Sequence, residues 1–392
     1  MTRFAHIADV HLGGWKQPPL QELNFQSFVK AIDICIENKL DFVLFAGDLF
    51  DSAYPPIETL KETFAQFKRL KEANIPCFLI AGSHDYSVSG KTFLDVLEKA
   101  GFCKNVLDSE EVLDAEGNVK EIRLNPHIHG NIAIYGYPGR KSGLEIPEIR
   151  KIKLNDAPGL FKIFMLHTTL DKVVGALPID SVESRTLPKA DYYALGHIHV
   201  LYDKDNIVYP GPLFPNNFKE LEDLKQGHFV LVDTESNQQI QRIQLPTKKV
   251  ESLTVKVDDG LIATEQIISE LNKLELEEKI ILLRVRGELQ RGKVSDIKFQ
   301  KVEDFVKEKG AYFLLKNIHD LSVKQIEIDV EIKDDSNIEQ ETIQQFAEEN
   351  VSDFNNLIEQ LIEALSKEKQ EDEKNETFNN RILDEARRVL KF

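Results

Sequence analysis

Short apolar runs alternate with amphipathic stretches over residues 1–245 of the chain. The runs are rich in Val, Ile, Leu and Phe, and several contain no polar residue, as expected of strands that are covered on both faces. Between the first runs, apolar residues such as Leu60, Phe64 and Phe67 recur at helical spacing. The pattern therefore predicts a layered α/β domain. Its strands are expected over 3–8, 41–46, 76–81, 131–136, 161–166, 191–195 and 227–233.

Beyond residue 245 the pattern changes twice. Residues 246–332 alternate strand-like and helix-like segments, which predicts a small α+β domain. In residues 333–392 the strand-like runs disappear, and two amphipathic helices are expected on either side of the charged break "SKEKQEDEKNE". These helices either pack back on their own chain or dock on a partner, and their periodicity is compatible with both.

Composition indicates a soluble globular protein, since 42% of the 392 residues are hydrophobic and 29% are charged. No run of about 18 apolar residues is present, so no membrane-spanning helix is expected, and the N-terminus lacks the pattern of a secretory signal. The three cysteines are far apart and lack C-x-x-C spacing, which favours a reducing, cytoplasmic setting. The net charge of −17 weakens the case for a nucleic-acid partner without excluding it, because residues 331–392 alone carry 17 acidic and 8 basic residues.

Five of the expected strands are followed directly by residues that can bind a metal or carry a proton. In open α/β sheets, functional groups gather at the carboxyl ends of the strands. We therefore expect these side chains to meet at one edge of the domain. In chain order they are Asp9, His11, Asp48, His84, Asp85, His167, His197 and His199.

The mixture of carboxylates and imidazoles favours Mn²⁺, Fe²⁺ or Zn²⁺ over Mg²⁺ and Ca²⁺, which prefer oxygen ligands. Asp9 and His11 are two residues apart, as are His197 and His199, so both members of each pair can turn to one side. Asp48 could bridge two cations about 3.5–4 Å apart, as in two-metal phosphoesterases. Any single histidine is more often a core or surface residue than a ligand, and five are not expected to bind metal for that reason: His6, His127, His129, His228 and His319.

The motifs "DVHLG", "GDLFD", "GSHD", "MLHT" and "GHIH" resemble, in order and spacing, those of the calcineurin-like metallophosphoesterases. Within that superfamily, "HIADVHLG", "YYALGHIH" and "YPGPL" resemble the SbcD-type nuclease subunit of a DNA double-strand-break repair complex. The resemblance implies a layered β-sandwich flanked by helices for residues 1–245 and a capping domain for 246–332. It also implies that the helices of 333–392 dock on an SbcC-type coiled-coil ATPase.

Carried over to this chain, the family pattern implies two divalent cations, with Mn²⁺ expected. The ligands implied for the first cation are Asp9, His11, Asp48 and His199. Those implied for the second are Asp48, Ser83, His167 and His197. His84 would protonate the leaving 3′ oxygen or steady the phosphate, and Asp85 would orient that imidazole. The family also forms dimers through the helices that correspond to residues 57–73 and 91–100, the latter carrying Phe93, Leu94 and Leu97.

Two residues depart from the family pattern. Ser83 stands where the family usually has Asn, and a hydroxyl is a shorter and weaker ligand than an amide carbonyl. The second cation could then be held loosely, held through a water, or absent. Asp51 stands where some members carry a second catalytic histidine, and it could orient a water or cap the following helix.

The leading hypothesis is a Mn²⁺-dependent hydrolase of phosphodiester bonds. It would act in double-strand-break repair as a 3′–5′ exonuclease on duplex ends and as an endonuclease on single strands, within a nuclease–ATPase complex located at the nucleoid in the cytoplasm. Arg140, Lys141 and Lys189 are the few basic residues near the expected DNA-binding rim. The alternatives are a catalytically weak scaffold that binds DNA ends for the ATPase, and a phosphodiesterase of small nucleotides.

Overall fold

The computed structural model describes most of the chain, and the described residues fall into two compact units. These units are Met1–Ser322 and Val323–Phe392. The described residues are 2–87, 90, 92–175, 179–235, 239–324, 343, 352, 355–367, 369 and 375–390.

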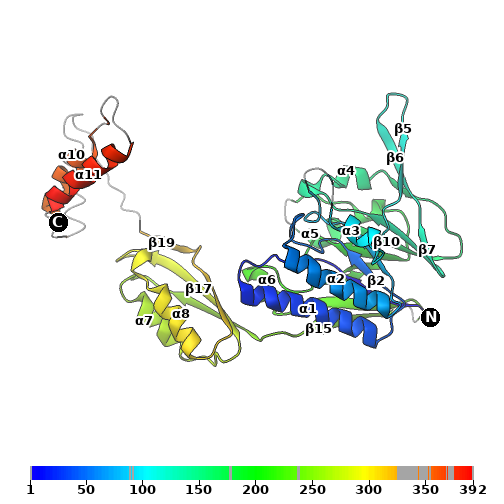
Figure 1. Ribbon diagram of the computed structural model, residues 1–392, viewed down its shortest axis with the longest axis horizontal. Coiled ribbons are helices and arrows are strands. Elements are labelled where there is room, and N and C mark those ends of the chain that lie inside the picture. Colours follow the sequence, from blue (N-terminus) through cyan, green and yellow to red (C-terminus); the bar gives the residue numbers. More distant parts are fainter. Residues whose placement is uncertain are drawn as a thin grey trace. The chain divides into compact units, whose positions relative to one another are not determined.

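A six-stranded sheet forms one layer of the first unit (Figure 1). β1 runs parallel to β2, β2 to β3 and β3 to β4, whereas β14 pairs with β1 in the antiparallel sense. In spatial order the strands are β15 (Gln239–Leu245), β14 (Gly227–Asp233), β1 (Arg3–Ile7), β2 (Phe42–Ala46), β3 (Cys77–Ile80) and β4 (Lys104–Asn105). The parallel strands β1, β2 and β3 therefore end at the same edge.

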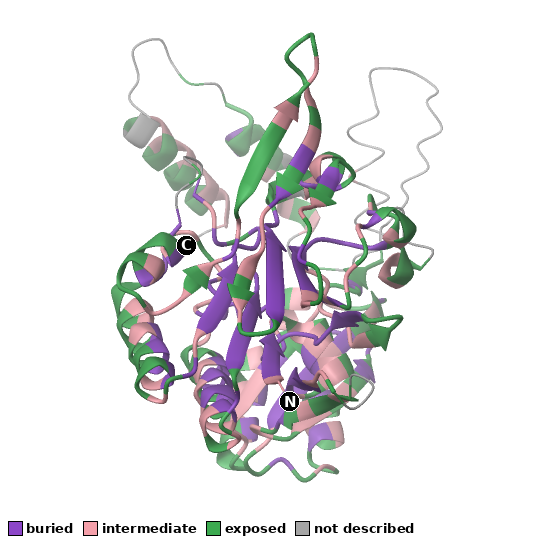
Figure 2. Ribbon diagram, turned by 90° about the vertical axis from the view of Figure 1, so that its right-hand side faces the viewer, coloured by how far each residue is buried: buried purple, intermediate pink, exposed green. Residues whose placement is uncertain are grey.

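A second six-stranded sheet packs against the first. Its strands, in spatial order, are β12 (Tyr202–Lys204), β13 (Ile207–Tyr209), β11 (Tyr192–Gly196), β10 (Phe161–His167), β8 (Ile132–Tyr137) and β7 (His127–His129). Apolar side chains from the facing strands of both sheets, such as Phe42, Ile134 and Met165, form one buried cluster. Figure 2 shows these buried strands at the centre of the unit. The architecture is a β-sandwich.

Two long helices cover the outer face of the first sheet. They are α1 (Pro18–Glu37) and α2 (Ile57–Glu72). Pro18 and Pro19 stand at the first helical positions of α1, where the missing N–H groups are not needed. Phe28 of α1 and Phe67 of α2 are fully buried, and their ring centroids lie 6.4 and 5.1 Å from that of Phe45 in β2. Apolar residues at helical spacing thus anchor both helices to the sheet.

Shorter elements complete the sandwich. A hairpin of β5 (Ser109–Leu113) and β6 (Val119–Leu124) forms a small sheet with β9 (Ile152–Leu154) and projects from the rest of the sandwich (Figure 1). The remaining short helices are α3 (Leu94–Lys99), α4 (Ile146–Ile149), α5 (Asp171–Val174) and α6 (Phe218–Leu224), together with the 3₁₀ turns Lys141–Gly143 and Ser184–Thr186.

A third sheet with its own buried cluster follows the sandwich in the chain. Its strands are β16 (Val250–Lys256), β17 (Ile280–Leu289), β18 (Phe313–Asn317) and β19 (Leu321–Val323). Its helices are α7 (Ala263–Leu271) and α8 (Phe299–Glu308), with a 3₁₀ turn at Val294–Asp296. The expected α+β content of this region is confirmed, while the domain boundaries at residues 245 and 332 stay predictions.

The second unit contains two described helices, α10 (Ile358–Leu365) and α11 (Asn375–Leu390), after a 3₁₀ turn at Asn355–Leu357. Ala364 is buried, and Lys367 Nζ lies 2.7 Å from Glu385 Oε2, so the two helices contact each other. Part of the region in which the first of the two amphipathic helices is expected, Phe346 and Phe354 included, lies outside the described residues. None of the described helices is both long and apolar enough to cross a membrane.

Candidate metal centre

The carboxyl ends of β1, β2, β3, β10 and β11 meet at one edge of the sandwich. Backbone hydrogen bonds join the first two of these ends: Val10 and His11 donate from N to the carbonyl oxygen of Asp48 at 2.9 and 3.0 Å. Asp9 donates from N to the carbonyl of Gly47 at 3.2 Å. The structure brings polar residues from the expected strand ends together, and these bonds fix the loop after β1 to the loop after β2.

Four of the polar residues at this edge adopt left-handed backbone conformations. Their φ angles are 52° for Asp9, 48° for His11, 52° for Asp48 and 96° for His197. Residues with a Cβ rarely adopt such angles, and where they do so together the surrounding structure enforces them, commonly at functional sites.

Glycines give the side chains room. A Cβ on Gly82 would lie 2.1 Å from Asp48 Oδ1, and a Cβ on Gly47 would lie 2.1 Å from His167 Nδ1. A Cβ on Gly139 would lie 2.4 Å from His167 Cδ2. The strand-end glycines are therefore required by the close approach of the Asp48 and His167 side chains.

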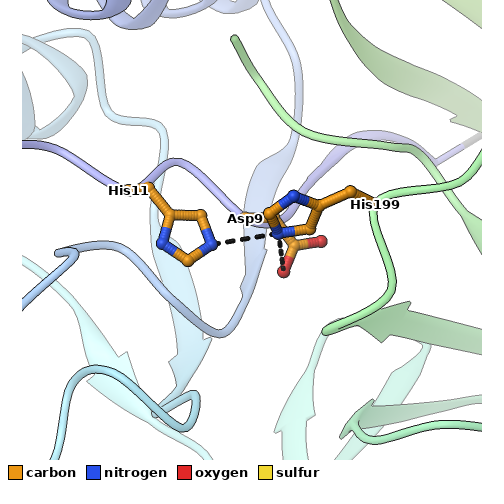
Figure 3. Close-up of side chains that lie close together, drawn as sticks. All are labelled: Asp9, His11 and His199. Carbon is orange, nitrogen blue, oxygen red and sulfur yellow. Dashed lines mark hydrogen bonds and ion pairs between the residues drawn. The ribbon is translucent and has the colours of Figure 1, made fainter. Parts of the chain in front are cut away.

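Asp9, His11 and His199 form a first cluster (Figure 3). His11 Nε2 lies 3.1 Å from His199 Nε2, and His199 Nε2 lies 3.8 Å from Asp9 Oδ1. The other oxygen of Asp9 is buried and has no hydrogen-bond partner among the described residues. Two imidazole nitrogens and a carboxylate that face a common point are a donor set suited to a divalent transition metal.

Asp48, His167 and His197 form a second cluster next to the first. Asp48 Oδ2 lies 3.1 Å from His167 Nε2 and 3.6 Å from His11 Nε2, so Asp48 contacts both clusters. Its other oxygen accepts a hydrogen bond from His84 N at 2.8 Å. This is the placement that a bridging carboxylate requires, and the residues present fit a pair of divalent cations.

Burial and neighbouring charges shift the pKa values of this pair. Burial alone would raise the pKa of Asp48, but the charge of His167 and their hydrogen bond outweigh it, and the pKa of Asp48 is lowered. Burial would likewise lower the pKa of His167, and the carboxylates of Asp48 and Asp9 reverse that effect and raise it. The cluster thus holds positive charge beside Asp48, and a bound cation would take over that role while displacing the proton.

His84 and Ser83 lie beside the two clusters. His84 Nδ1 lies 2.9 Å from the carbonyl oxygen of Asp51, so Nε2 is the nitrogen that can act on a ligand. The His84 side chain is 48% exposed. Ser83 is buried. Together with His84 and His197, it lines two adjoining hollows with volumes of about 330 and 500 Å³. The clusters are thereby accessible from outside through a hollow that His84 lines.

The structure places Asp85 differently from the expectation that it orients the His84 ring. Its buried carboxylate accepts hydrogen bonds from the backbone N–H groups of Gly82, Phe50 and Leu49 at 2.9, 3.0 and 3.3 Å. Burial and the nearby Asp48 raise its pKa to about 6. Asp85 therefore ties the loop after β3 to the loop after β2. The ring of His84 is instead held by the carbonyl of Asp51.

Two residues that sequence reasoning missed also belong to the site. Glu220 of α6 accepts a hydrogen bond from His199 Nδ1 at 2.9 Å. Asn216 Nδ2 lies 3.5 Å from Asp51 Oδ1, which in turn lies 3.1 Å from His11 Nδ1. The stretch "NFKE" has the spacing of a helix start, with Asn217 as the N-cap, but that signal does not indicate a metal site.

Comparisons with known proteins agree with this geometry. Residues 2–201 match the family model described as calcineurin-like phosphoesterase. The DNA double-strand break repair protein Mre11 of Methanosarcina mazei is 29% identical over 344 residues, which cover 82% of this chain and 50% of the relative. The protein of the same name from Methanocaldococcus jannaschii is 29% identical over 273 residues, or 64% of this chain and 69% of the relative.

A Bacillus subtilis protein described as the uncharacterized metallophosphoesterase YhaO is 30% identical over 245 residues, which cover 58% of this chain and 56% of the relative. The chain spans about half the length of the Methanosarcina relative. The family match extends over more than half of the 392 residues and includes all five strand ends that build the two clusters. The chain belongs to the calcineurin-like phosphoesterase family, with the metallophosphoesterase fold.

Proposed function

We propose that the protein is a Mn²⁺-dependent DNA nuclease that acts in double-strand-break repair as a subunit of a nuclease–ATPase complex. The observation that carries the proposal is the pair of Asp/His clusters joined by Asp48, with His84 beside them. The family membership supports hydrolysis of a phosphoester, and the names of several relatives support DNA repair. The expected polarity is 3′–5′ on duplex ends, together with endonuclease action on single strands.

The side chains of the site would have two kinds of role, metal binding and proton transfer. Asp9, His11, Asp48 and His199 would hold one cation, and Asp48, His167 and His197 would hold the second together with Ser83. Such a pair, when bound, neutralises the phosphate and activates the attacking group. His84 would assist departure of the 3′ oxygen as the protonated imidazole: its Nδ1–H is held by the Asp51 carbonyl, and the Nε2 proton would pass to the leaving oxygen.

The larger hollow suits a nucleic-acid strand. Tyr54, Tyr86 and Lys141 line it beside His84, and Tyr54 is 73% exposed. Aromatic rings stack on bases, and a lysine contacts phosphate without regard to sequence. Arg140 makes an ion pair with Glu148 at 3.2 Å, so Lys141 is the better placed of these two neighbouring basic residues to contact a phosphate.

Two partners are part of the proposal. The helices α10 and α11 are proposed to dock on a coiled-coil ATPase, and a homodimer is proposed through α2 and α3. Ile57 and Val96, 80% and 47% exposed, supply apolar contact area on those helices. Leu94 and Leu97 are buried in the chain's own core, so they are not available to a second copy. The proposed location is the cytoplasm, at the nucleoid.

The test is degradation of an end-labelled linear duplex and a single-stranded circle with Mn²⁺ or Mg²⁺. The parent is compared with His84→Ala and Ser83→Asn. We expect Mn²⁺-dependent cutting by the parent that falls at least about 100-fold in His84→Ala, the lower range for loss of a general acid. If His84→Ala cuts both substrates as fast as the parent does, the proposed role of His84 is contradicted.

Ser83, at the position where the family usually has Asn, is the reason for a second candidate function. If the parent does not cut and Ser83→Asn does, the second cation is lost in the natural sequence and a DNA-end-binding scaffold becomes the better description. Hydrolysis of bis-p-nitrophenyl phosphate and cyclic nucleotides without cutting of DNA would instead indicate a phosphodiesterase of small nucleotides.

A further inference from the structure

Helix α6 lies between the first Asp/His cluster and the third sheet. Its seven residues follow Asn216 and Asn217, which line the smaller hollow together with Glu220. Its opposite side contacts strands of the third sheet, and Leu221 is fully buried there in one cluster with Ile280 and Leu282 of β17. One short helix, with the adjoining Trp15 region, therefore connects the first cluster to the third sheet.

On the side of the cluster, Glu220 fixes the ring of His199. Its Oε1 accepts from His199 Nδ1 at 2.9 Å, and its Oε2 accepts from the backbone N–H of Asn216 at 2.8 Å. The backbone N–H of Glu220 donates to Asn217 Oδ1 at 2.9 Å, which caps the start of α6 and fixes the backbone that carries this carboxylate. A donor proton on Nδ1 leaves the Nε2 lone pair directed at Asp9 and His11, which is the tautomer that a metal ligand needs.

On the side of the third sheet, Arg284 of β17 holds α6. Its Nη2 donates to Glu222 Oε2 at 2.9 Å, and its guanidinium carbon lies 5.0 Å from the ring centroid of Phe218. Both charged side chains are about three-quarters covered, at 21% and 24% exposed. A guanidinium that is both paired and stacked holds its partners in a defined geometry.

We propose that Glu220 is a positioning residue for His199, and that Arg284 sets the same imidazole through α6. The third sheet would thereby contribute to cation affinity through the contacts of Arg284 with Glu222 and Phe218 of α6. The proposal rests on the metal site proposed above and deepens it. Coupling of this kind is reciprocal, so cation binding would also stabilise the contact between α6 and β17.

The size of the expected effect follows from comparable sites. Loss of a carboxylate that orients a metal-binding histidine weakens metal affinity about 10–100-fold. We expect that range for Glu220→Gln, because the amide places an NH₂ group against either the His199 N–H or the Asn216 N–H. For Arg284→Met, which keeps apolar contact with Phe218 but removes the ion pair, we expect a smaller loss of roughly threefold to tenfold.

The experiment is a titration of the metal-free chain of 392 residues with Mn²⁺, in which free Mn²⁺ is measured by electron paramagnetic resonance. Lys316→Met is the matched control, because Lys316 of β18 also combines an ion pair with a contact over an aromatic ring. Its Nζ lies 2.6 Å from Glu303 and 5.2 Å from the centroid of the Phe299 ring, and both partners belong to α8, which packs on the third sheet. We expect Lys316→Met to bind as the parent does. Equal affinity of the parent and Glu220→Gln would overturn the positioning role, and equal affinity of Arg284→Met and Lys316→Met would overturn the coupling.

Two measurements keep the result interpretable. If Glu220→Gln does not fold, a double-mutant cycle of Arg284→Met, Glu222→Gln and the double variant decides the coupling. Non-additive losses of Mn²⁺ affinity would support the coupling, and additive losses would overturn it. A parent chain that binds no Mn²⁺ would overturn the proposed metal site together with this inference. A parent that binds, with variants that bind equally well, would overturn this inference alone.

Discussion

Asp48 is the residue on which both clusters depend, because its Oδ2 contacts His11 in one and His167 in the other. Its position depends on Gly82, where a Cβ would lie 2.1 Å from Asp48 Oδ1 and 2.3 Å from Asp48 N. We expect Gly82→Ala to destabilise the fold by about 1–3 kcal/mol, the usual range for overpacking. We expect the same change to weaken Mn²⁺ binding at least about 10-fold, as measured by titration beside a thermal melt.

Gly159→Ala is the control for backbone effects. Gly159 has a φ of 75°, and a Cβ at this position would meet no heavy atom within 4 Å, so its substitution introduces backbone strain without a clash. It should lower stability by roughly 1 kcal/mol and leave Mn²⁺ affinity unchanged. Unchanged affinity in Gly82→Ala would show that Asp48 tolerates displacement.

His6 governs a second residue-scale property, the response of stability to pH. It is fully buried, its Nδ1 lies 3.0 Å from the Tyr192 hydroxyl, and burial lowers its pKa to about 3. The unfolded chain binds a proton at this residue below about pH 6.5 while the folded chain does not, so stability is present above that pH and is lost as the pH falls.

We expect His6 to contribute a loss of about 1.4 kcal/mol in unfolding free energy between about pH 7.5 and 5.5. In His6→Phe this component should be absent, so the variant's denaturant midpoint should fall less over the same interval. Dilute protein is required at the lower pH, which is close to the pI of about 5.2. Identical pH dependence in parent and variant would assign the acid sensitivity to other groups.

Sequence reasoning identified the residues of both clusters because each follows a strand, and parallel strands deliver their carboxyl ends to one edge. It could not identify Glu220, which follows no strand and approaches His199 only after the chain has turned through α6. For Asp85 the structure shows partners other than the expected His84 ring, namely backbone N–H groups of two loops. Adjacent residues direct their side chains to different sides, so Asp85 faces the loop of Asp48 while His84 faces the hollow.

At the scale of elements, the buried strands were predictable and the exposed ones were not. β2 is buried at every position and was expected over almost the same residues. The strands of the hairpin β5–β6 have two buried positions, Ile122 and Leu124, so the hairpin lacks the apolar run that identifies a buried strand in the sequence. Its pairing with β9 depends on residues distant in the chain, which local pattern does not reveal.

The exposed apolar residues of α2 and α3 carry an element-scale prediction. Ile57→Glu combined with Val96→Glu should convert the proposed dimer to a monomer, because two charges would be buried unpaired at the interface. Mass by light scattering at micromolar concentration measures the change. Leu144→Glu is the control, since Leu144 is 64% exposed and lies outside both helices. A variant that keeps the parent's dimeric mass would place the interface elsewhere.

At the scale of the whole molecule, the second compact unit predicts what truncation does. Removal of residues 323–392 leaves the core clusters of the first unit complete. We expect the truncated chain to melt within about 2 °C of the parent in the same metal-free buffer, because no core residue of the first unit is removed. It should keep its Mn²⁺ affinity and lose capture of the coiled-coil ATPase that is proposed as its partner. A large fall in melting temperature would show that residues 323–392 stabilise the first unit.

The backbone angles at Asp9, His11, Asp48 and His197 have a consequence for directed evolution. Left-handed angles are least costly for glycine and asparagine, so a library randomised at these four positions and selected for folding alone should be enriched in those two residues. The same library selected for cation binding should return aspartate and histidine. The divergence between the two pools would measure, position by position, how much conformational strain the chain retains for the sake of its chemistry.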